Sequence, residues 1–403
     1  MSSARVAITG LGAVSAAGIG APALWAAARD GQSQISTTDL PRGERLRIRI
    51  AGQVRDFDGA SYLDEAVLRR CDRFTQFAHV AVEEALLQSG ISSDELRGPR
   101  TAAIIGTGIG GMNTIDDGTY EYYAGSGKFN MLAIPRLMPS SATSHVSITH
   151  GVTGPCFTVT SACSSASQSI GVAAQLIRAG IVDRAIVGGS EACITPTTVR
   201  AWEFLRVLSP DTCRPFSADR NGMILGEGAG AVILESEAAA AARGAKPIAW
   251  LAGYGTSSDA RDIVQPDVGG ASAAMTAAIE DAGLTPDDID YINAHGTGTV
   301  LNDVNEAEAI ARVFGAKGAD VPVSSTKPVI GHTLGASGAL ELIVTIRALT
   351  ESTIPPHINV TNVDPKCRLN LPREAVAAPL KAALSNSFAF GGINASLVVV
   401  AAA

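Results

Sequence analysis

The stretch AVEEALLQSGISSDEL at residues 81–96 returns as AMTAAIEDAGLTPDDI at residues 274–289. In both copies an Ala-rich helical pattern ends at a glycine, an acidic turn follows, and the next apolar segment leads to Gly-Thr-Gly, at residues 106–108 and 296–298. A glycine after the last helical residue is a common helix stop. Because the two copies share the order of these features and not only their composition, we interpret the chain as two copies of one α/β unit rather than as a chance similarity of helices.

Short β-branched segments alternate with Ala-rich helical segments along the chain, which is the pattern of an α/β protein. A second, weaker sequence similarity relates the helix expected after residue 163 to the helix expected after residue 332. We place the division between the copies near Pro247, which ends a helical stretch, so that residues 1–250 form one half and residues 251–403 the other. Residues from both halves should then meet at one pseudo-symmetric centre. The pattern predicts strands over 5–8, 101–105 and 184–187, and helices over 77–88 and 168–178.

The composition is that of a globular protein with a large core, because 46% of the 403 residues are hydrophobic and only 17% are charged. The formal net charge of -8 and the lack of any Lys/Arg run argue against nucleic acid as a partner, since phosphate backbones are bound by clustered cations. No stretch is apolar for long enough to span a membrane, and no basic segment precedes an apolar run at the start. We therefore expect a cytoplasmic protein with no membrane partner.

Two glycine-rich stretches resemble nucleotide-binding loops but depart from them. Residues 10–15 follow an expected strand, yet Ser15 replaces the third glycine of a dinucleotide fingerprint, so we interpret this stretch as a tight turn. Residues 106–111 lack the Lys-Ser/Thr ending of a phosphate-binding loop and instead predict a close approach of two backbones. No cofactor is expected.

The strongest local signal is GPCFTVTSACSSASQSI at residues 154–170. A β-branched strand ends at Cys163, and a helix of almost exclusively small residues begins there. The thiol would then lie at a helix N-terminus, where the macrodipole and the free N–H groups favour the thiolate and lower its pKa. Free cysteines are most often small buried hydrophobic residues, and from this context alone the two interpretations are equally good.

Six cysteines occur without any C-x-x-C pair, which indicates neither a disulfide framework nor a zinc site. Two of the six histidines, His295 and His332, occupy glycine-rich turns that we expect after strands, and Lys327 lies shortly before the second. Both imidazoles would point into one cleft if the halves are pseudo-symmetric, so a functional site is the better interpretation for this pair. Their spacing matches no metal motif, and no metal is expected. The remaining histidines are interpreted as structural residues: His79, His145, His150 and His357.

Several segments resemble, in the same order along the chain, the β-ketoacyl-acyl-carrier-protein synthases of the elongating type. The resemblance covers essentially the whole chain. The segments are VAITGLG at residues 6–12, the stretch around Cys163, residues 214–230, HGTGT at 295–299, KPVIGHTLGASG at 327–338 and SNSFAFGGIN at 385–394.

The resemblance implies an α/β, thiolase-like fold of two duplicated halves in five α-β-α-β-α layers, and a dimer. It also implies a decarboxylative Claisen condensation, in which Cys163 takes an acyl group from a carrier-protein thioester while His295 and His332 bind the malonyl thioester carbonyl. The backbone N–H groups of Cys163 and Phe390 correspond to the oxyanion hole, and Phe390 also corresponds to the gate. Further residues implied for the site are Lys327 beside the second histidine, the supporting residues Glu341, Thr297 and Thr299, and Ile109, Met223 and Phe388 in the acyl pocket.

These residue types suit that chemistry. A thiolate is both a good nucleophile and a good leaving group, as acyl transfer requires. Loss of carbon dioxide from a malonyl group generates an enolate, which needs hydrogen-bond donors aimed at one oxygen more than it needs a strong base. Two imidazole N–H groups in a dry pocket are such donors.

Three residues depart from the family pattern: Ala389 where glycine usually precedes the gate, Ile393 where threonine is usual, and Met223 where an aromatic residue is usual. Ala389 should stiffen the gate. None of the three belongs to the catalytic set, so they affect the length and shape of the acyl chain, which the sequence leaves open. They favour the ketosynthase subunit of a type II polyketide or polyene system over the alternative, a housekeeping fatty-acid-elongating synthase II.

Two other classes were weighed against these. A catalytically inactive partner of the chain-length-factor kind lacks the nucleophile, and Cys163 argues against it. A thiolase would use a second cysteine in a glycine-rich C-terminal loop, which the surroundings of Cys367 do not provide.

The implied partners are an acyl carrier protein that delivers acyl and malonyl groups, and either a second copy of the chain or a chain-length-factor homologue. Docking of an acidic carrier protein needs a local basic patch, because the chain as a whole is acidic. The sequence offers arginines for it, although each is more simply a solvated surface residue: Arg49, Arg69, Arg70, Arg73 and Arg136.

Overall fold

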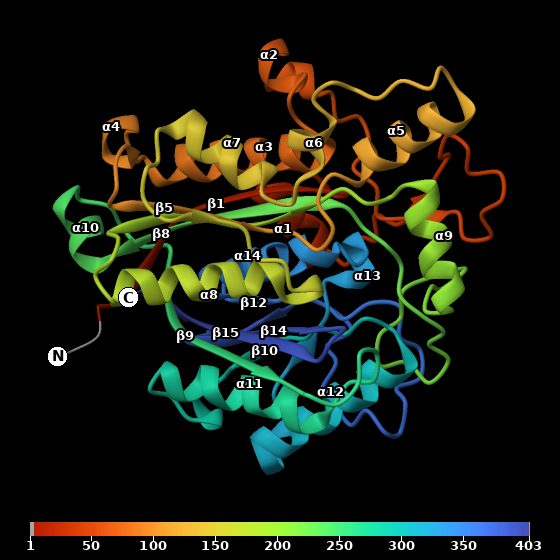
Figure 1. Cartoon of the computed structure of the whole chain (residues 1–403). Helices are drawn as coiled ribbons and strands as arrows, with labels where there is room; N and C mark the ends of the chain where they lie inside the picture. The colour runs from red at the N-terminus through yellow and green to blue at the C-terminus, as the bar shows by residue number, and fades with distance from the viewer. Residues whose placement is uncertain (1–3, 403) are drawn as a thin grey trace.

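The computed structural model describes residues 4–402, and its sheets and helices form five stacked layers (Figure 1). The layered α/β architecture implied by the resemblance is confirmed. From the top of Figure 1 downwards, the layers are α3 (Arg73–Ser89) with α7 (Ser141–His150), the first sheet, α8 (Ser165–Arg178) with α14 (Ser337–Thr350), the second sheet, and α11 (Val268–Asp281) with α12 (Val300–Phe314).

The second sheet repeats the strand order of the first. The order is β6-β5-β7-β8-β1 in the N-terminal sheet and β11-β10-β14-β15-β9 in the C-terminal sheet. In each sheet the first two pairings are parallel and the last two are antiparallel. Shared order and shared direction make the two sheets copies of one unit. The strands are β1 (Val6–Ser15), β5 (Thr101–Gly106), β6 (Cys156–Phe157), β7 (Arg184–Glu191), β8 (Gly228–Ser236), β9 (Ala249–Ser258), β10 (Tyr291–Asn293), β11 (Val323–Ser324), β14 (Ala382–Ala389) and β15 (Ile393–Ala401).

The two sheets are joined along one edge. Antiparallel pairs between β1 and β9 run from Val6 with Leu251 to Ile8 with Ala249. The predicted division after residue 250 falls just inside β9 and stays a prediction, and its outer ends, residues 1–3 and 403, lie outside the described residues.

The strands predicted over 5–8, 101–105 and 184–187 and the helices predicted over 77–88 and 168–178 are present, and each observed element extends at least one end of its prediction by a residue or more. The strand predicted to end at Cys163 is wrong, because β6 ends at Phe157 and a 3-10 turn holds Cys163. The acidic turns of the two copies are both capping boxes, at Ser92 with Glu95 and at Thr285 with Asp288. The copies differ at Gly-Thr-Gly: its first glycine, Gly106, ends β5, whereas β10 ends before residues 296–298 are reached.

One local prediction was wrong. Residues 10–15 are not a tight turn, because β1 continues through them. The glycines are needed because α3 crosses this strand closely: a Cβ on Gly10 would lie 2.0 Å from the carbonyl oxygen of Ala85, and a Cβ on Gly12 would lie 1.9 Å from that of Ala81. Glycine here permits contact between helix and sheet rather than chain reversal.

The close approach predicted for residues 106–111 is confirmed. A Cβ on Gly106 would lie 2.6 Å from the backbone of Ser165, where α8 begins. This contact holds the central helix against the first sheet.

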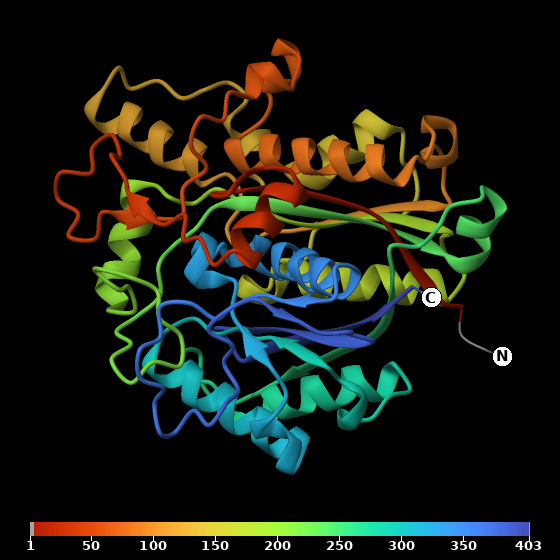
Figure 2. The same cartoon turned by 180° about the vertical axis from the view of Figure 1, so that it is seen from behind.

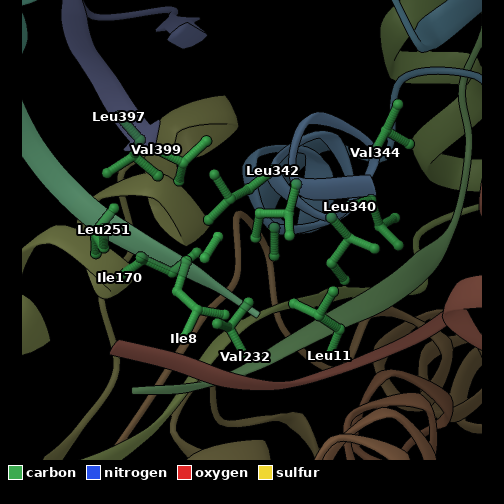
Figure 3. Packing of buried hydrophobic residues seen from close by; sticks show 14 of the residues in the cluster. Ile8, Leu11, Ile170, Val232, Leu251, Leu340, Leu342, Val344, Leu397 and Val399 are labelled. Atoms are coloured by element: carbon green, nitrogen blue, oxygen red, sulfur yellow. The ribbon is translucent and has the colours of Figure 1, made fainter. Parts of the chain in front are cut away.

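The largest hydrophobic cluster lies between the two sheets and surrounds the central helices. Figure 3 shows Ile8 and Val232 of the first sheet and Leu397 of the second on either side of Leu342 of α14. Twelve of the 14 residues of α14 are buried, as expected for a helix that is apolar on all sides. Seen from behind, in Figure 2, α1 packs beside α14 and closes this core.

The remaining elements are short. Within residues 4–402, no helix combines the length and the apolar character that crossing a membrane requires. The remaining elements are the helices α1 (Ala21–Arg29), α2 (Glu65–Leu68), α4 (Ser93–Leu96), α5 (Met112–Ala124), α6 (Ala133–Leu137), α9 (Pro196–Leu205), α10 (Glu237–Ala242) and α13 (Lys327–Ile330), the 3-10 turns η1 (Gly59–Ser61), η2 (Ala162–Ser164), η3 (Pro286–Asp288), η4 (Gly315–Ala319) and η5 (Leu334–Ala336), and the strands β2 (Gly18–Ile19), β3 (Ser36–Thr37), β4 (Ile50–Ala51), β12 (Thr353–Ile354) and β13 (Val376–Ala377).

Candidate active site

Two equivalent turns bring a cysteine and a histidine together at the centre of the molecule. The 3-10 turn η2 leads into α8, and η5 leads into α14. Ala162 and Leu334 have left-handed φ angles of 49° and 44°, so the chain bends in the same way at both places. Cys163 follows the first bend and His332 precedes the second, and the Cys163 Sγ lies 3.0 Å from the His332 Nε2.

The small residues after Cys163 let the two central helices approach each other. A Cβ on Gly338 of α14 would lie 2.1 Å from the Oγ of Ser167 on α8. The same Oγ lies 2.8 Å from the Ser387 Oγ of β14. Larger side chains would separate the helices and, with them, the two turns. The sequence placed the helix start at Cys163, whereas the α-helix begins at Ser165 after the 3-10 turn.

His332 presents an N–H group to the sulfur. Its Nδ1 accepts a hydrogen bond from the backbone N–H of Leu334 at 3.2 Å and lies 2.9 Å from the Ser337 Oγ. A backbone N–H can only donate, so Nδ1 carries the lone pair and the proton of the neutral ring is on Nε2. The predicted preceding strand is wrong, because His332 follows the helical turn α13.

His295 is held in the same state from the other side. It follows β10, as predicted. The Lys327 Nζ donates to its carbonyl oxygen at 2.5 Å and lies 3.3 Å from its Nδ1. An ammonium can only donate, so the ring proton is again on Nε2. The Glu306 carboxylate accepts from the backbone N–H of His295 at 2.8 Å, and the two imidazole centroids are 5.3 Å apart.

Burial, assisted by the charge of Lys327, keeps both rings neutral. Burial lowers the pKa of His295 and of His332 well below 6.5, and the charge of Lys327 lowers both pKa values further. The Lys327 Nζ lies 2.5 Å from the Glu341 Oε1, and both side chains are buried. Burial raises the pKa of Glu341 to about 7, against the opposing effect of Lys327. The two neutral rings therefore act as donors through their Nε2–H groups.

The Cys163 thiol behaves differently from the prediction. Burial raises its pKa to about 12, and the charge of Lys327 acts in the opposite direction. The predicted lowering of this pKa is wrong, because loss of solvation outweighs the field of the helix terminus. The protonated thiol is therefore the resting form. Its sulfur is nevertheless not sealed in apolar packing, since it faces an imidazole N–H and lines a cavity.

One cavity collects most of the predicted site residues. Ile109 packs in the apolar cluster that includes Cys163 and Met223 without lining the cavity. Thr297 and Thr299 line the cavity, and their hydroxyl oxygens are 2.8 Å apart. The predicted residues in its wall are Cys163, Met223, His295, Thr297, Thr299, His332, Phe388 and Phe390, with Lys327 and Glu341 buried behind His295.

Phe390 lies in the turn between β14 and β15, and its ring stacks on Trp202 with centroids 5.8 Å apart. Among the turn and loop hydrogen bonds between backbone groups of residues 4–402, none is donated by the backbone N–H of Phe390 or of Cys163. Both residues line the cavity.

The ligand atoms of Cys163, His295 and His332 all lie within 4.8 Å of one another, a spacing that a metal ion could use. Their chemistry suits an anionic oxygen better, because both rings present N–H groups and the Lys327 ammonium adjoins them. We therefore assign no step to a metal.

The other histidines lie outside this cavity. His357 has a hydrogen-bond partner at each ring nitrogen, whereas His79, His145 and His150 belong to the outer helices α3 and α7. Arg73 is not a solvated surface residue, since it is paired with a buried carboxylate.

Four groups that hold the site were not predicted from the sequence. Glu306 had a weak signal, as an acid on the buried face of a helix that follows His295. Ser337 and Trp202 resemble ordinary core residues in their helices, and the backbone N–H of Leu334 has no signal in sequence at all.

Known proteins share both the sequence and the fold. The family model for the beta-ketoacyl synthase N-terminal domain matches residues 3–240, and that for the C-terminal domain matches residues 248–361. Nodulation protein E of Rhizobium leguminosarum bv. trifolii is 45% identical over 98% of this chain and 98% of its own. The 3-oxoacyl-[acyl-carrier-protein] synthase 2 of Staphylococcus aureus (strain COL) is 39% identical over 98% and 97%. The solved structure titled "The ishigamide ketosynthase/chain length factor" superposes with a TM-score of 0.95 at 33% identity, over 99% of this chain and 100% of the other.

Proposed function

This chain belongs to the β-ketoacyl synthase family, and from that premise we propose that Cys163 is its nucleophile. The protein is a ketosynthase, an acyltransferase that condenses units carried by acyl carrier protein. The observation that carries the assignment is the 3.0 Å contact between the Cys163 Sγ and the His332 Nε2, beside His295 in one cavity. A catalytically inactive, chain-length-factor-like partner would lack this thiol.

In the first step the Cys163 sulfur attacks the carbonyl carbon of an acyl thioester on the carrier protein. The S–C bond to Cys163 forms, the S–C bond to the carrier breaks, and the thiol proton ends on the departing carrier thiol. The N–H groups of Cys163 and Phe390 bind the oxyanion that develops on the carbonyl oxygen. The His332 Nε2–H, at 3.0 Å, stabilises the negative charge that the sulfur carries during this transfer.

In the second step malonyl on a carrier protein loses carbon dioxide. The Nε2–H groups of His295 and His332 donate to the thioester oxygen, so the electron pair of the broken C–C bond is held as an enolate. No protein base is needed, because the malonyl carboxylate is already ionised. Removing such a donor typically costs about a hundred- to a thousand-fold in rate.

In the third step the enolate carbon attacks the acyl group on Cys163. A C–C bond forms, the bond from carbon to sulfur breaks, and the Cys163 thiolate takes up one proton from solvent. The product is a β-ketoacyl thioester on the carrier protein, two carbons longer than the acyl group that entered.

The assignment of the nucleophile is tested by the intact mass of the protein after incubation with an acyl-carrier-protein thioester. We expect the wild type to gain the acyl mass and Cys163→Ala to gain none. Cys367→Ser is the matched control: this buried cysteine lies outside the cavity and would be needed only by a thiolase, so the variant should load as the wild type does. Loading in Cys163→Ala, or its loss in Cys367→Ser, would contradict the proposal.

We propose further that the protein is the ketosynthase subunit of a type II polyketide or polyene system. Two of the three departures from the family pattern, Ala389 and Met223, line the cavity that holds Cys163, whereas Ile393 does not. The likeness to a ketosynthase paired with a chain length factor supports this pathway. The alternative, fatty-acid elongation, has its own support in the 39% identity to a 3-oxoacyl-[acyl-carrier-protein] synthase 2.

The two pathways differ in their products and partners. Co-purification from the native cell, followed by intact mass of the complex and of carrier-bound products, should give a heterodimer with a chain-length-factor homologue and poly-β-keto or polyene chains. A homodimer that makes saturated fatty acyl chains would support elongation instead. The cytoplasmic location of the protein stays a prediction from the sequence.

A further inference from the structure

A second group of side chains with metal-binding chemistry lies in the outer helical layer, above the first sheet in Figure 1. Cys71 stands just before α3, His79 lies within α3, and His145 lies on the neighbouring helix α7. The Cys71 sulfur and one ring nitrogen of each histidine all lie within 4.8 Å of one another. The two imidazole centroids are 5.8 Å apart, with the rings at 71°.

One interior member of this group lacks the partner that a buried polar group normally has. Cys71 has no exposed surface and His79 is 2% exposed. The His79 Nε2 is fully buried and has no hydrogen-bond partner among the described residues. A buried polar atom without a partner calls for an explanation, and a bound cation would supply it.

Binding of a cation by the thiol also has a proton cost. A metal ion must displace the Cys71 thiol proton when it binds, because the thiolate is the form of cysteine that ligates metals.

We propose that Cys71, His79 and His145 form a binding site for Zn²⁺. One thiolate and two imidazoles are ligands that zinc prefers, and they leave the fourth tetrahedral position for water. On binding, the Cys71 S–H bond breaks, the sulfur donates its electron pair to the metal, and one proton goes to the buffer. The ion would link the start of α3 to α7, the two helices that cover the first sheet.

This site is separate from the condensation. None of its three residues lines the cavity that holds Cys163. The metal is therefore expected to affect stability and not the transfer of acyl groups.

The test uses the full chain with Cys163→Ala, because the cluster of Cys163, His295 and His332 could itself bind metal. The reduced, metal-stripped protein is titrated with Co²⁺, whose sulfur-to-metal charge-transfer band reports a thiolate ligand, and then with Zn²⁺ against a competing chelator. We expect one Co²⁺ per chain with that band, displacement by Zn²⁺, and release of one proton per metal bound.

Matched variants separate this site from adventitious binding. Cys71→Ser should abolish the charge-transfer band, and the exposed Cys156→Ser should keep it. His145→Gln should weaken Zn²⁺ binding at least about tenfold, whereas His150→Gln on the same helix should change it less than twofold. His145 is only partly buried, so its variant tests the site even if Cys71→Ser does not fold.

The proposal is overturned if the protein binds no Co²⁺, if the band survives in Cys71→Ser, or if His145→Gln and His150→Gln bind Zn²⁺ equally well. Circular dichroism of each variant checks that the compared proteins are folded.

Discussion

His332 and His295 owe their state to neighbours that can only donate hydrogen bonds. The Leu334 N–H fixes the lone pair of His332, and the Lys327 ammonium fixes that of His295. Both rings then direct Nε2–H groups into the cavity without needing a positive charge. This explains why a buried lysine and two buried histidines can lie side by side: the rings stay neutral, and Glu341 balances the one remaining cation.

The two contacts at the His332 Nδ1 should differ in importance. Ser337→Ala removes the hydroxyl at 2.9 Å but leaves the Leu334 N–H, so the ring keeps its tautomer. We expect malonyl decarboxylation to fall less than about tenfold, the equivalent of roughly one hydrogen bond. His332→Ala should lower it about a hundred- to a thousand-fold. Release of labelled carbon dioxide measures both, and equal losses in the two variants would show that the serine sets the tautomer.

His357 should make the protein sensitive to acid. Burial lowers its pKa to about 4 from an ordinary 6.5, so the unfolded chain binds this proton more readily than the folded one. Its contribution to stability is complete above pH 6.5 and is lost as the pH falls towards 4. By linkage, about 2 kcal/mol of it should be gone at pH 5.

The measurement for His357 is urea unfolding of the wild type and of His357→Gln at pH 7 and pH 5. The difference in unfolding free energy between the two proteins should shrink by about 2 kcal/mol at the lower pH. Because the readout is a change with pH, hydrogen bonds lost in both conditions cancel. A difference that stays constant would contradict the assigned pKa.

At the scale of elements, the long helices and strands were predictable, whereas the role of the glycines was predicted correctly at residues 106–111 and wrongly at residues 10–15. The helices 77–88 and 168–178 were found because Ala-rich segments alternate with β-branched segments along the chain. Residues 10–15 were misread because glycine serves equally for a turn and for a close contact, and only the position of α3 decides between them. The helical turn before His332 was missed for a related reason, since α13 has only four residues and no period to detect.

The contact between α8 and α14 should couple packing to catalysis. In Gly338→Ala the new Cβ would meet the Ser167 Oγ at 2.1 Å and its backbone nitrogen at 2.9 Å, so the helices must separate. We expect a loss of about 1–3 kcal/mol in stability. A shift of about 1 Å between Cys163 and His332 costs roughly a hundred-fold in rate. Thermal unfolding and the rate of condensation measure the two effects.

Two further variants isolate that contact. Ser167→Gly in the Gly338→Ala background removes the obstructing oxygen and should restore part of the activity. Gly90→Ala has open space around its Cβ but a left-handed φ of 65°, so it should cost about 1–2 kcal/mol and leave the rate unchanged. If Gly90→Ala slowed condensation as much as Gly338→Ala, the loss of activity would reflect general instability instead.

At the scale of the whole molecule, the sequence predicted which residues meet but not what holds them. Duplication indicated that residues of the two halves meet at one centre, and the family resemblance implied that these residues are Cys163, His295 and His332. Of the supporting groups, Glu306 left only a weak signal as an acid on the buried face of a helix, and the Leu334 N–H left none, because its position follows from how the turn closes around His332. The high pKa of Cys163 likewise comes from burial by both halves together, whereas the sequence indicated only the helix that follows it.

The two halves should unfold as one unit although they are copies of each other. Pairs such as Val6 with Leu251 join their sheets, and α8 of one half packs on α14 of the other inside a shared hydrophobic core. Separating the halves would expose this core, so neither half has a stable folded state without its partner. We expect a single calorimetric transition with equal calorimetric and van't Hoff enthalpies. The scans are repeated at several protein concentrations, so that any dissociation of a dimer can be separated from unfolding of the chain. Two resolved transitions, or a fragment of residues 4–247 that unfolds cooperatively by itself, would mean that the halves are independent domains that only share an interface.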